Sequence, residues 1–415
     1  MNSKTILVHP TGNTFVRALT ASLLENDMLA EFHTTVTTFP GTLLEKLGQL
    51  PYFNELHRRQ YDAVLKPYSH QSPWYELGRQ LANMSGFRQL TRHETGPFSV
   101  DAVYRQLDRR VSKRLSASTH GPINAVYAYE DGALATFTEA KKQGIKCVYE
   151  LPIAFWSTGR RLMHEEAERL PAWAITLGGG TQDSPEKLER KCHELELADL
   201  VVVPSYFVND SLPNWAKTKQ VVMAPFGTPT FTTPATVPVA PTANRPLRVL
   251  FAGSMGQRKG LGDLFDAIKL LNSSAIELVV LGSLQAPMSF YRSQLPHFTY
   301  EPGRSHADVL ALMRSCDVFC LPSIVEGRAL VMQEAMSQGL PLLITPNTGG
   351  HDLIQEGKTG FLIPIRSPAA IAEKLQWFLD NRAAIPTMGQ LAQQHAATYT
   401  WQQYGNSIVS SINGC

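Results

Sequence analysis

The stretch DVFCLPSIVEGRALVMQEAMSQGLPLLITP, residues 317–346, carries two glutamates eight positions apart between two apolar runs. The apolar runs indicate buried strands, and the residues between them favour a helix. This order predicts Glu326 in the loop after a strand and Glu334 about one turn inside the following helix. Ligands of open α/β sheets bind in the crevice beyond the carboxyl ends of the strands. Both glutamates are therefore candidate ligand-binding residues.

The same alternation of strands and helices runs through both halves of the chain. The first half has strand-like KTILVHP, PINAVYAYE, KCVYELP and ADLVVVPS, and the second has LRVLFAG, IELVVLG, FTYEPG and VFCLPS. Strands that alternate with helices of about 10–15 residues predict parallel sheets covered on both faces.

The boundary between the two halves is a segment rich in proline and threonine, residues 229–246. It has no helical or alternating period, so it predicts an interdomain linker. The resulting fold class is α/β, with two Rossmann-like doubly wound domains, residues 1–228 and 247–394, facing a cleft. We expect residues 395–415 to form a C-terminal helix that packs back on the first domain.

Composition excludes several classes of protein. The chain has 415 residues, 43% hydrophobic and 18% charged, which is typical of a globular protein of about two to three domains. A formal net charge of +2 is too small to suggest a nucleic-acid-binding protein. Five scattered cysteines without CxxC spacing indicate reduced thiols rather than a disulfide framework or a zinc site. No apolar run approaches the roughly 20 residues of a membrane span, and the N-terminus is unlike a signal peptide, so we expect a cytoplasmic location.

A glycine-rich turn in FAGSMGQRKGLGDLFDAIKLL, residues 251–271, is the candidate anion site. Backbone N–H groups at a helix start, together with Arg258 or Lys259, suit a phosphate group. The turn lacks the fuller GxGxxG and GxxxxGK[ST] patterns, so an ordinary strand-to-helix turn is the alternative. Glu326 and Glu334 could act as an acid–base pair or could bind sugar hydroxyls, since a carboxylate accepts two hydrogen bonds from a diol. A solvated helix residue is the alternative for Glu334.

These motifs resemble those of retaining glycosyltransferases of family 4, which have the GT-B fold. The resemblance rests on FAGSMGQRKG, on LPS followed by EGRALVMQEAMSQGLP, and on GGHDLIQEGKTGFLIP, in that order. ADLVVVPSYFVNDSL and then VVMAPFG resemble the end of the first domain of such enzymes. The resemblance implies retaining transfer of a hexosyl or deoxyhexosyl group from a nucleotide-diphosphate sugar to a saccharide, lipid-linked or small polar acceptor, as in polysaccharide biosynthesis. It implies no cofactor and no metal, and the sequence has no Asp-x-Asp to hold a metal ion.

The resemblance also implies roles for particular residues. Glu334 would hold the ribose of the donor, Glu326 would face the donor sugar, and Lys259 would bind the diphosphate. Glu326 and Lys259 are thus the expected catalytic residues. The first domain would bind the acceptor. The remaining expected site residues are Gly253, Ser254, Arg258, Gly282, Arg304, Arg328, Ala329 and Leu330 for the donor, the last two through backbone amides, and Gly12, Asn13 and Glu150 for the acceptor.

The sequence departs from the family pattern at several positions. Ser254 stands where many members have arginine, and Arg328-Ala329 where many have Phe-Gly. A guanidinium can form paired hydrogen bonds to phosphate, so we expect Arg328 to replace the cation missing at Ser254. Arg258 is the rival, and a solvent-facing Arg328 is the alternative. The strand KCVYELPIAFW lacks the histidine that often ends it; His9 and His164 are substitutes or simply structural. Asp352 replaces the glutamate of the usual GGxPE segment.

A basic helix is predicted over residues 102–115. Its apolar residues Val103, Leu107, Val111 and Leu115 share one face. Such a helix either contacts an anionic membrane surface, here the inner face of the cytoplasmic membrane, or is a solvated helix packed on the sheet. Its cations are Arg105, Arg109, Arg110, Lys113 and Arg114.

Two other functions remain open. One is a GT-B epimerase or hydrolase of nucleotide sugars, which would need an acid–base pair on the first domain. The other is a non-catalytic protein that binds a sugar nucleotide for a partner enzyme, a possibility raised by Ser254.

Overall fold

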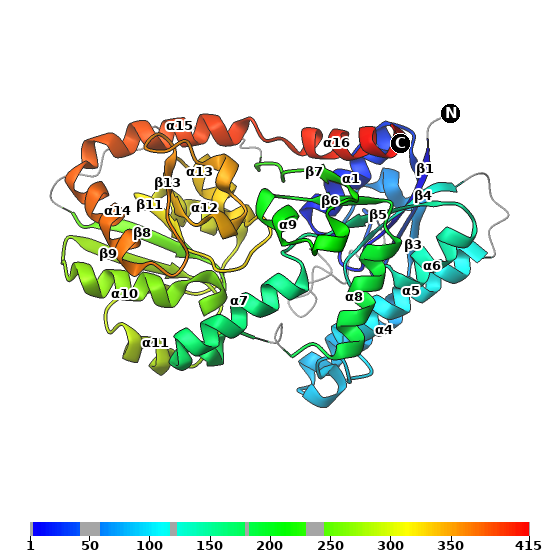
Figure 1. Ribbon diagram of the computed structural model, residues 1–415, viewed down its shortest axis with the longest axis horizontal. Coiled ribbons are helices and arrows are strands. Elements are labelled where there is room, and N and C mark those ends of the chain that lie inside the picture. Colours follow the sequence, from blue (N-terminus) through cyan, green and yellow to red (C-terminus); the bar gives the residue numbers. More distant parts are fainter. Residues whose placement is uncertain (1–2, 42–58, 117–122, 179–181, 230–244, 415) are drawn as a thin grey trace.

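The computed structural model describes residues 3–41, 59–116, 123–178, 182–229 and 245–414, and is shown in Figure 1. Nearly all of the expected linker, residues 229–246, lies outside these ranges. The described chain contains two parallel β-sheets, and each half of the chain supplies one of them. The predicted fold class, two doubly wound α/β domains, is confirmed.

The first sheet has seven strands in the order β3-β2-β1-β4-β5-β6-β7, all parallel. Alternate residues of β1 face opposite layers: Leu7 packs on one side, and Ile6 and Val8 pack on the other. The strands are β1 (Lys4–Val8), β2 (Leu29–Thr34), β3 (Ser69–Gln71), β4 (Ile123–Tyr129), β5 (Lys146–Glu150), β6 (Leu200–Val203) and β7 (Gln220–Met223). The helices between them are α1 (Thr14–Glu25), α4 (Pro73–Met84), α5 (Val100–Ser116), α6 (Leu134–Lys142), α7 (Trp156–Arg169), α8 (Pro185–Leu197) and α9 (Tyr206–Ser211).

The second sheet has six parallel strands in the order β10-β9-β8-β11-β12-β13. A single large apolar core surrounds it, and α10 and α14 pack together, as do α13 and α15. The strands are β8 (Leu247–Ala252), β9 (Ile276–Leu281), β10 (Thr299–Glu301), β11 (Val318–Leu321), β12 (Leu342–Ile344) and β13 (Gly360–Leu362). The helices are α10 (Leu261–Leu271), α11 (Met288–Gln294), α12 (His306–Arg314), α13 (Leu330–Ser337), α14 (Pro368–Asp380) and α15 (Ile385–Ala397).

The end of the chain returns to the first sheet. Helix α16 (Trp401–Asn413) starts with a capping box, in which the Thr400 side chain accepts from the Gln403 amide and the Gln403 side chain accepts from the Thr400 amide. Its buried face, including Tyr404, Ile408 and Ile412, joins the core layer that contains α1. Figure 1 shows α16 lying along α1, close to the N-terminus.

Helix α5 buries the predicted face. Val103, Leu107, Val111 and Leu115 are each at most 2% exposed, and the last three lie in the core layer between α5 and the sheet. Arg109, Arg110 and Lys113 are exposed, whereas Arg114 pairs with Glu31 of β2 at 2.9 Å. None of the helices in the described part of the chain is long and apolar enough to cross a membrane.

Candidate functional site

Glu326 lies between β11 and α13 and contacts two cations at once. Its Oε1 atom is 2.5 Å from Lys259 Nζ and 2.6 Å from Arg258 Nη1. The side chains of Lys259 and Glu326 are each 11% exposed. Burial lowers the pKa of Lys259, and the Arg258 charge lowers it further, while Glu326 opposes both. Two cations on one carboxylate leave one formal positive charge, which suits an anionic ligand.

The turn that carries both cations is held against the loop that carries Glu326. Gly260 has a φ of +71°, and a Cβ atom there would lie 2.0 Å from the Pro322 carbonyl oxygen. Only glycine allows this approach and this backbone conformation. The Ile324 amide also donates to the Arg258 carbonyl at 2.9 Å. The close approach of the two loops therefore produces the cluster.

Gln257, next to Arg258, is fully buried and uses every polar group it has. Its amide donates to Thr176 Oγ1 at 3.0 Å, and its Nε2 donates to Glu166 and Asp263, both at 2.8 Å. Its Oε1 accepts from the Gly262 amide at 2.9 Å. Saturated buried hydrogen bonds fix a side chain in one geometry. The candidate anion-site turn is thus positioned by α7 and by the short 3-10 helix after it.

These two helices come from the first half of the sequence but pack on the second domain (Figure 1). Arg169 of α7 donates to both carboxylate oxygens of Asp263 at 2.8 Å. Trp173, in the 3-10 helix Pro171–Thr176, lies in the core of the second domain with its ring centroid 5.6 Å from that of Phe265. Glu166 is fully buried and pairs with Arg169 and Arg366. A division of the chain at residue 228 therefore leaves residues that pack in the second domain in the first segment.

Glu334 lies on the first turn and a half of α13, as expected from the sequence. Its side chain is 19% exposed, and Oε1 is 3.1 Å from Nε2 of His306, the first residue of α12. Glu334 therefore faces the loop that follows β10, on the same strand-end edge of the sheet as the Glu326 cluster. Arg304 lies in that loop and forms an ion pair with Glu301.

The position of Arg328 contradicts both the role and the solvent exposure considered for it from the sequence. Its side chain is fully buried, and Nη1 is 2.7 Å from Asp352 Oδ1 and 3.2 Å from the Gly349 carbonyl. Nε donates to Gln333, and the guanidinium stacks 4.9 Å from the Tyr399 ring centroid. Among the described residues its partners belong to the interior of the second domain, so Arg328 neither replaces the cation missing at Ser254 nor faces solvent.

The two backbone amides expected to touch the donor, those of Ala329 and Leu330, differ in whether they are free to bind it. The Ala329 N–H is already used, since it donates to the Thr348 carbonyl at 3.2 Å. Leu330 is the first residue of α13, where backbone N–H groups point out of the helix end. The amide role assigned to Ala329 is therefore wrong, while that of Leu330 stays a prediction.

The expected glycines Gly253 and Gly282 lie side by side. A Cβ atom on Gly282 would come 1.7 Å from the Gly253 carbonyl oxygen, so the ends of β8 and β9 meet there. The aliphatic chain of Lys259 runs past Gly253, with Cε 3.2 Å from where its Cβ would be. Ser254 is half-buried beside them.

In the first domain, the turn after β1 brings His9, Gly12 and Asn13 together. His9 Nδ1 accepts from the Thr11 and Gly12 amides at 3.1 and 2.9 Å. Burial, with the charge of Arg59, lowers the pKa of His9 to about 3, so it is a neutral structural residue. Asn13 is exposed and stands at the N-cap of α1 without a capping side-chain bond. His164 is exposed on α7.

The structure also contradicts the prediction that Glu150 lines the acceptor cleft. Its side chain is buried, and the residue is 1% exposed. Its carboxylate accepts from Tyr127 at 2.6 Å and from Tyr404 of α16 at 3.1 Å. Burial raises the pKa of Glu150 to about 7, although these hydrogen bonds oppose the rise. Glu150 joins the C-terminal helix to the first sheet.

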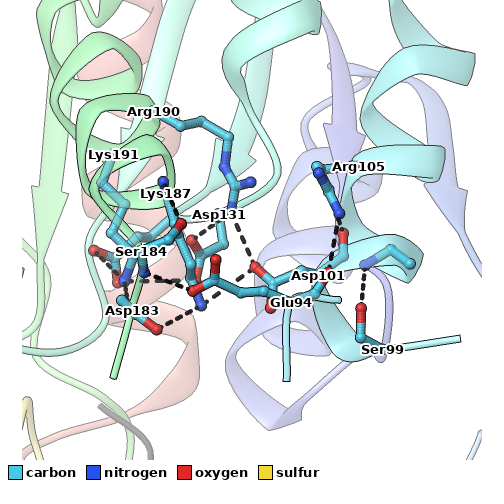
Figure 2. Close-up of polar contacts among 12 residues, drawn as sticks. Glu94, Ser99, Asp101, Arg105, Asp131, Asp183, Ser184, Lys187, Arg190 and Lys191 are labelled. Carbon is cyan, nitrogen blue, oxygen red and sulfur yellow. Dashed lines mark hydrogen bonds and ion pairs between the residues drawn. The ribbon is translucent and has the colours of Figure 1, made fainter. Parts of the chain in front are cut away.

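Two groups among the described residues could hold a metal ion, and both lie in the first domain: Glu31 with His33 and His70, and His93 with Glu94 and Asp183. In the second group, Asp183 already pairs with Lys187 at 3.1 Å. Figure 2 shows Asp183 within a network of opposite charges that joins α8 to the start of α5 through residues such as Lys187, Arg190 and Asp101. The ammonium groups of Lys187 and Lys191 lie beside the Asp183 carboxylate.

Comparison with known proteins places the second domain in a broad group. Residues 232–395 match the family model for glycosyl transferases group 1. D-inositol 3-phosphate glycosyltransferase of Paenarthrobacter aurescens is 30% identical over 169 residues, which cover 37% of this chain and 41% of that protein. The capsular polysaccharide biosynthesis glycosyltransferase CapM of Staphylococcus aureus is 28% identical over 145 residues, 34% of this chain and 38% of CapM. The chain thus matches about two fifths of the length of these relatives.

Solved structures match almost the whole chain. Sucrose-phosphate synthase from Thermosynechococcus elongatus superposes with a TM-score of 0.59 at 17% identity, covering 98% of this chain and 97% of that one. HepE of Anabaena in complex with UDP superposes with a TM-score of 0.59 at 13% identity, covering 99% and 100%. The chain has the GT-B fold. In this GT-B chain the Glu326 cluster lies at the strand ends of the second sheet, inside the region that the family model matches.

Proposed function

We propose that this GT-B chain is a retaining glycosyltransferase of family 4 type. It moves a hexosyl or deoxyhexosyl group from a nucleotide-diphosphate sugar to a saccharide, lipid-linked or small polar acceptor. One observation carries the proposal: Lys259 and Arg258 converge on Glu326 within 2.6 Å at the strand ends of the second sheet.

The cluster suits the departure of a diphosphate. As the bond to the sugar breaks, the leaving phosphate gains negative charge, and fixed cations stabilise that charge without reorganising. Lys259 and Arg258 would bind the phosphate oxygens, while Glu326 would face the donor sugar. The two cations supply the charge stabilisation that a bound metal ion can otherwise give, so the proposed reaction is metal-independent.

The rest of the donor would extend along the strand ends. Glu334 would accept hydrogen bonds from the ribose hydroxyls, and Leu330 would offer a backbone amide. Gly253, Ser254, Gly282 and Arg304 follow β8, β9 and β10 and would border the nucleotide. HepE binds UDP and has this fold, so uridine diphosphate sugars are the first donors to test.

The acceptor would bind beside Gly12 and Asn13, at the strand ends of the first sheet. Relatives named for capsular polysaccharide and colanic acid biosynthesis favour a saccharide acceptor. We place the enzyme in the cytoplasm, with a peripheral contact at the inner face of the membrane through the basic helix, residues 102–115.

A two-step experiment tests the proposal. Thermal unfolding with UDP-, GDP-, ADP- and dTDP-sugars identifies the donor, because a ligand that binds only the folded state stabilises it. Turnover is then measured with and without acceptor, and the product anomer is assigned by NMR. We expect transfer with retention, and a Lys259→Ala variant that loses about 10²-fold in kcat, the scale of a lost transition-state donor.

The same measurements separate the alternatives. Conversion of the donor without any acceptor would indicate an epimerase or hydrolase. Binding without turnover would indicate a sugar-nucleotide-binding partner protein. An inverted product anomer, or a kcat of Lys259→Ala within about threefold of wild type, would contradict the proposed mechanism.

A further inference from the structure

Exposed apolar side chains are concentrated in one short part of the first domain. Between residues 64 and 100, Trp74 is 75% exposed, Phe87 64%, Leu81 60% and Met84 57%. Val64, Tyr75, Leu90 and Val100 are exposed in the same segment. Single exposed apolar residues are normal on a protein surface, whereas a concentration of large ones marks an interaction site.

On helix α4 these apolar side chains lie on one face of the helix. Trp74, Leu77, Leu81 and Met84 are spaced by three, four and three residues, which places them on one face of the helix. Of these, Leu77 is half-buried and the other three are exposed. The helix therefore carries a continuous apolar stripe directed toward solvent.

The stripe is held outward by charge pairing on another side of α4. Glu76 is 1% exposed, and its carboxylate lies 2.6 Å from Arg59 and 2.7 Å from Arg79. Breaking a buried ion pair is strongly unfavourable, so these pairs favour the orientation of α4 that leaves the stripe exposed.

A cationic hollow lies beside α4. It has a volume of about 560 Å³. Four of its eight described lining residues are cationic, and none of the eight is acidic. Arg109, Arg110 and Lys113 are exposed on α5, and Tyr75 of α4 lines the same hollow. The lining residues are Tyr75, Pro97, Ala102, Arg105, Gln106, Arg109, Arg110 and Lys113.

We propose that the apolar stripe of α4 and the cations of α5 form one docking surface for an anionic lipid bilayer. Trp74, Leu81 and Met84 enter the boundary between headgroups and acyl chains, and Arg109, Arg110 and Lys113 bind headgroup phosphates. An apolar face with flanking arginine and lysine is the pattern of interfacial helices. The inference deepens the proposed function, on which it rests for a membrane contact, but it adds α4 as the inserting element.

Charge complementarity selects the bilayer over a second copy of the chain. A two-fold dimer pairs the same surface with itself. Two copies joined across this face would bring the cationic hollows together, and like charges oppose that pairing. Anionic lipid supplies both the opposite charge and the apolar layer.

Co-sedimentation of the full chain with vesicles tests the proposal without any transfer assay. The vesicles are phosphatidylcholine alone or phosphatidylcholine mixed with phosphatidylglycerol. We expect binding to the mixed vesicles, weakening as salt rises. Arg109→Ala with Arg110→Ala should weaken it about 30-fold, or about 2 kcal/mol at about 1 kcal/mol per basic residue. Trp74→Ala with Leu81→Gln should lower it by at least about tenfold through lost apolar burial.

Matched controls lie on another surface of the same domain. Trp215 is 46% exposed and Lys217 is exposed, both outside the segment, so Trp215→Ala with Lys217→Ala should bind vesicles as wild type does. Equal binding to both vesicle types, or full binding by the α4 and α5 variants, would overturn the proposal. A concentration-dependent dimer lost in those variants would assign the surface to self-association instead. The thermal shift caused by UDP should be the same in these variants as in wild type. The donor site, and with it the proposed function, is then tested independently of membrane binding.

Discussion

At the scale of single residues, Glu326 raises the pKa of Lys259 relative to the value that burial alone would produce. Burial lowers the pKa of Lys259, and the 2.5 Å contact with Glu326 opposes that effect. Under the proposed function, the carboxylate would keep the ammonium charged until a donor phosphate replaced it, and the strength of donor binding would depend on pH.

Glu326→Gln should therefore lower the pKa of Lys259 further. If a charged Lys259 binds the diphosphate, affinity for UDP falls as pH rises through that pKa, and the fall should begin at lower pH in the variant. Calorimetry from about pH 6 to about pH 10 measures it, a range that extends toward the ordinary lysine value. If UDP affinity falls at the same pH in both proteins, Glu326 does not affect the pKa of Lys259.

Arg328→Ala should act on stability. Removing one partner of a buried ion pair leaves the other uncompensated, which costs about 3–5 kcal/mol. Asp352 is 21% exposed and can regain some water, so we expect about 3 kcal/mol. Urea unfolding measures this loss, and Ser254→Arg should not restore it. Recovery of donor binding in the double variant would instead support the charge replacement that the geometry contradicts.

At the scale of secondary-structure elements, α7 is the feature that most affects the site. It leaves the first sheet after β5, and its far end contacts the turn of Gln257. Leu162 and Met163 of α7 also pack on Ile324 and Val325, just before Glu326. One helix therefore braces both loops that carry the cluster.

Glu166→Gln tests this bracing role. The variant keeps the shape but loses charge-assisted bonds to Arg169 and Arg366, each worth about 1.5–3 kcal/mol. We expect kcat/KM for the donor to fall about tenfold with little change in the KM for the acceptor, because small displacements of positioned groups slow catalysis.

A neighbour on the same helix provides the control. Glu165 is 35% exposed and pairs with Arg161 and Arg366 at the surface. Exposed ion pairs contribute little to stability, so the Glu165→Gln variant should have nearly normal kinetics. Equal effects of the two substitutions, or a change confined to thermal stability, would argue against a positioning role for α7.

At the scale of the whole molecule, helix α16 near the end of the chain packs beside helix α1 near its start. Tyr404 of α16 and Tyr127 of β4 share the buried carboxylate of Glu150, although 254 positions separate Glu150 from Tyr404. Helix α16, which follows the second domain in the sequence, thus packs on the sheet of the first domain.

This junction predicts a pH dependence. Burial raises the pKa of Glu150 from 4.5 to about 7, so the folded state binds a proton that the unfolded state has lost between those values. Its contribution to stability is fully present below about pH 4.5 and is lost as pH rises to about 7, by about 3 kcal/mol. Glu150→Gln lacks this loss, so its free energy of unfolding should exceed that of wild type by a margin that grows from pH 5 to pH 8. Urea unfolding at both pH values checks it, and a constant margin would place the titration elsewhere.

The amino-acid sequence by itself determined the alternation of elements, the two-domain α/β class and the local position of Glu326 and Glu334. Each follows from spacing within a few residues, because the period of apolar residues and the glycines at turns act through the local backbone. The face of α5 that packs on the sheet was readable for the same reason. So was the glycine-rich turn that carries Arg258 and Lys259.

Only the tertiary structure decided which charged groups meet. Arg328 contacts Asp352, which is 24 positions away in the sequence. Glu166 contacts both Gln257, 91 positions away, and Arg366, 200 positions away. Glu150 ends a strand as the cleft hypothesis required, yet a helix from the far end of the chain covers it. No local period encodes such contacts, because burial and ion pairing depend on what packs over a residue after the whole chain has folded.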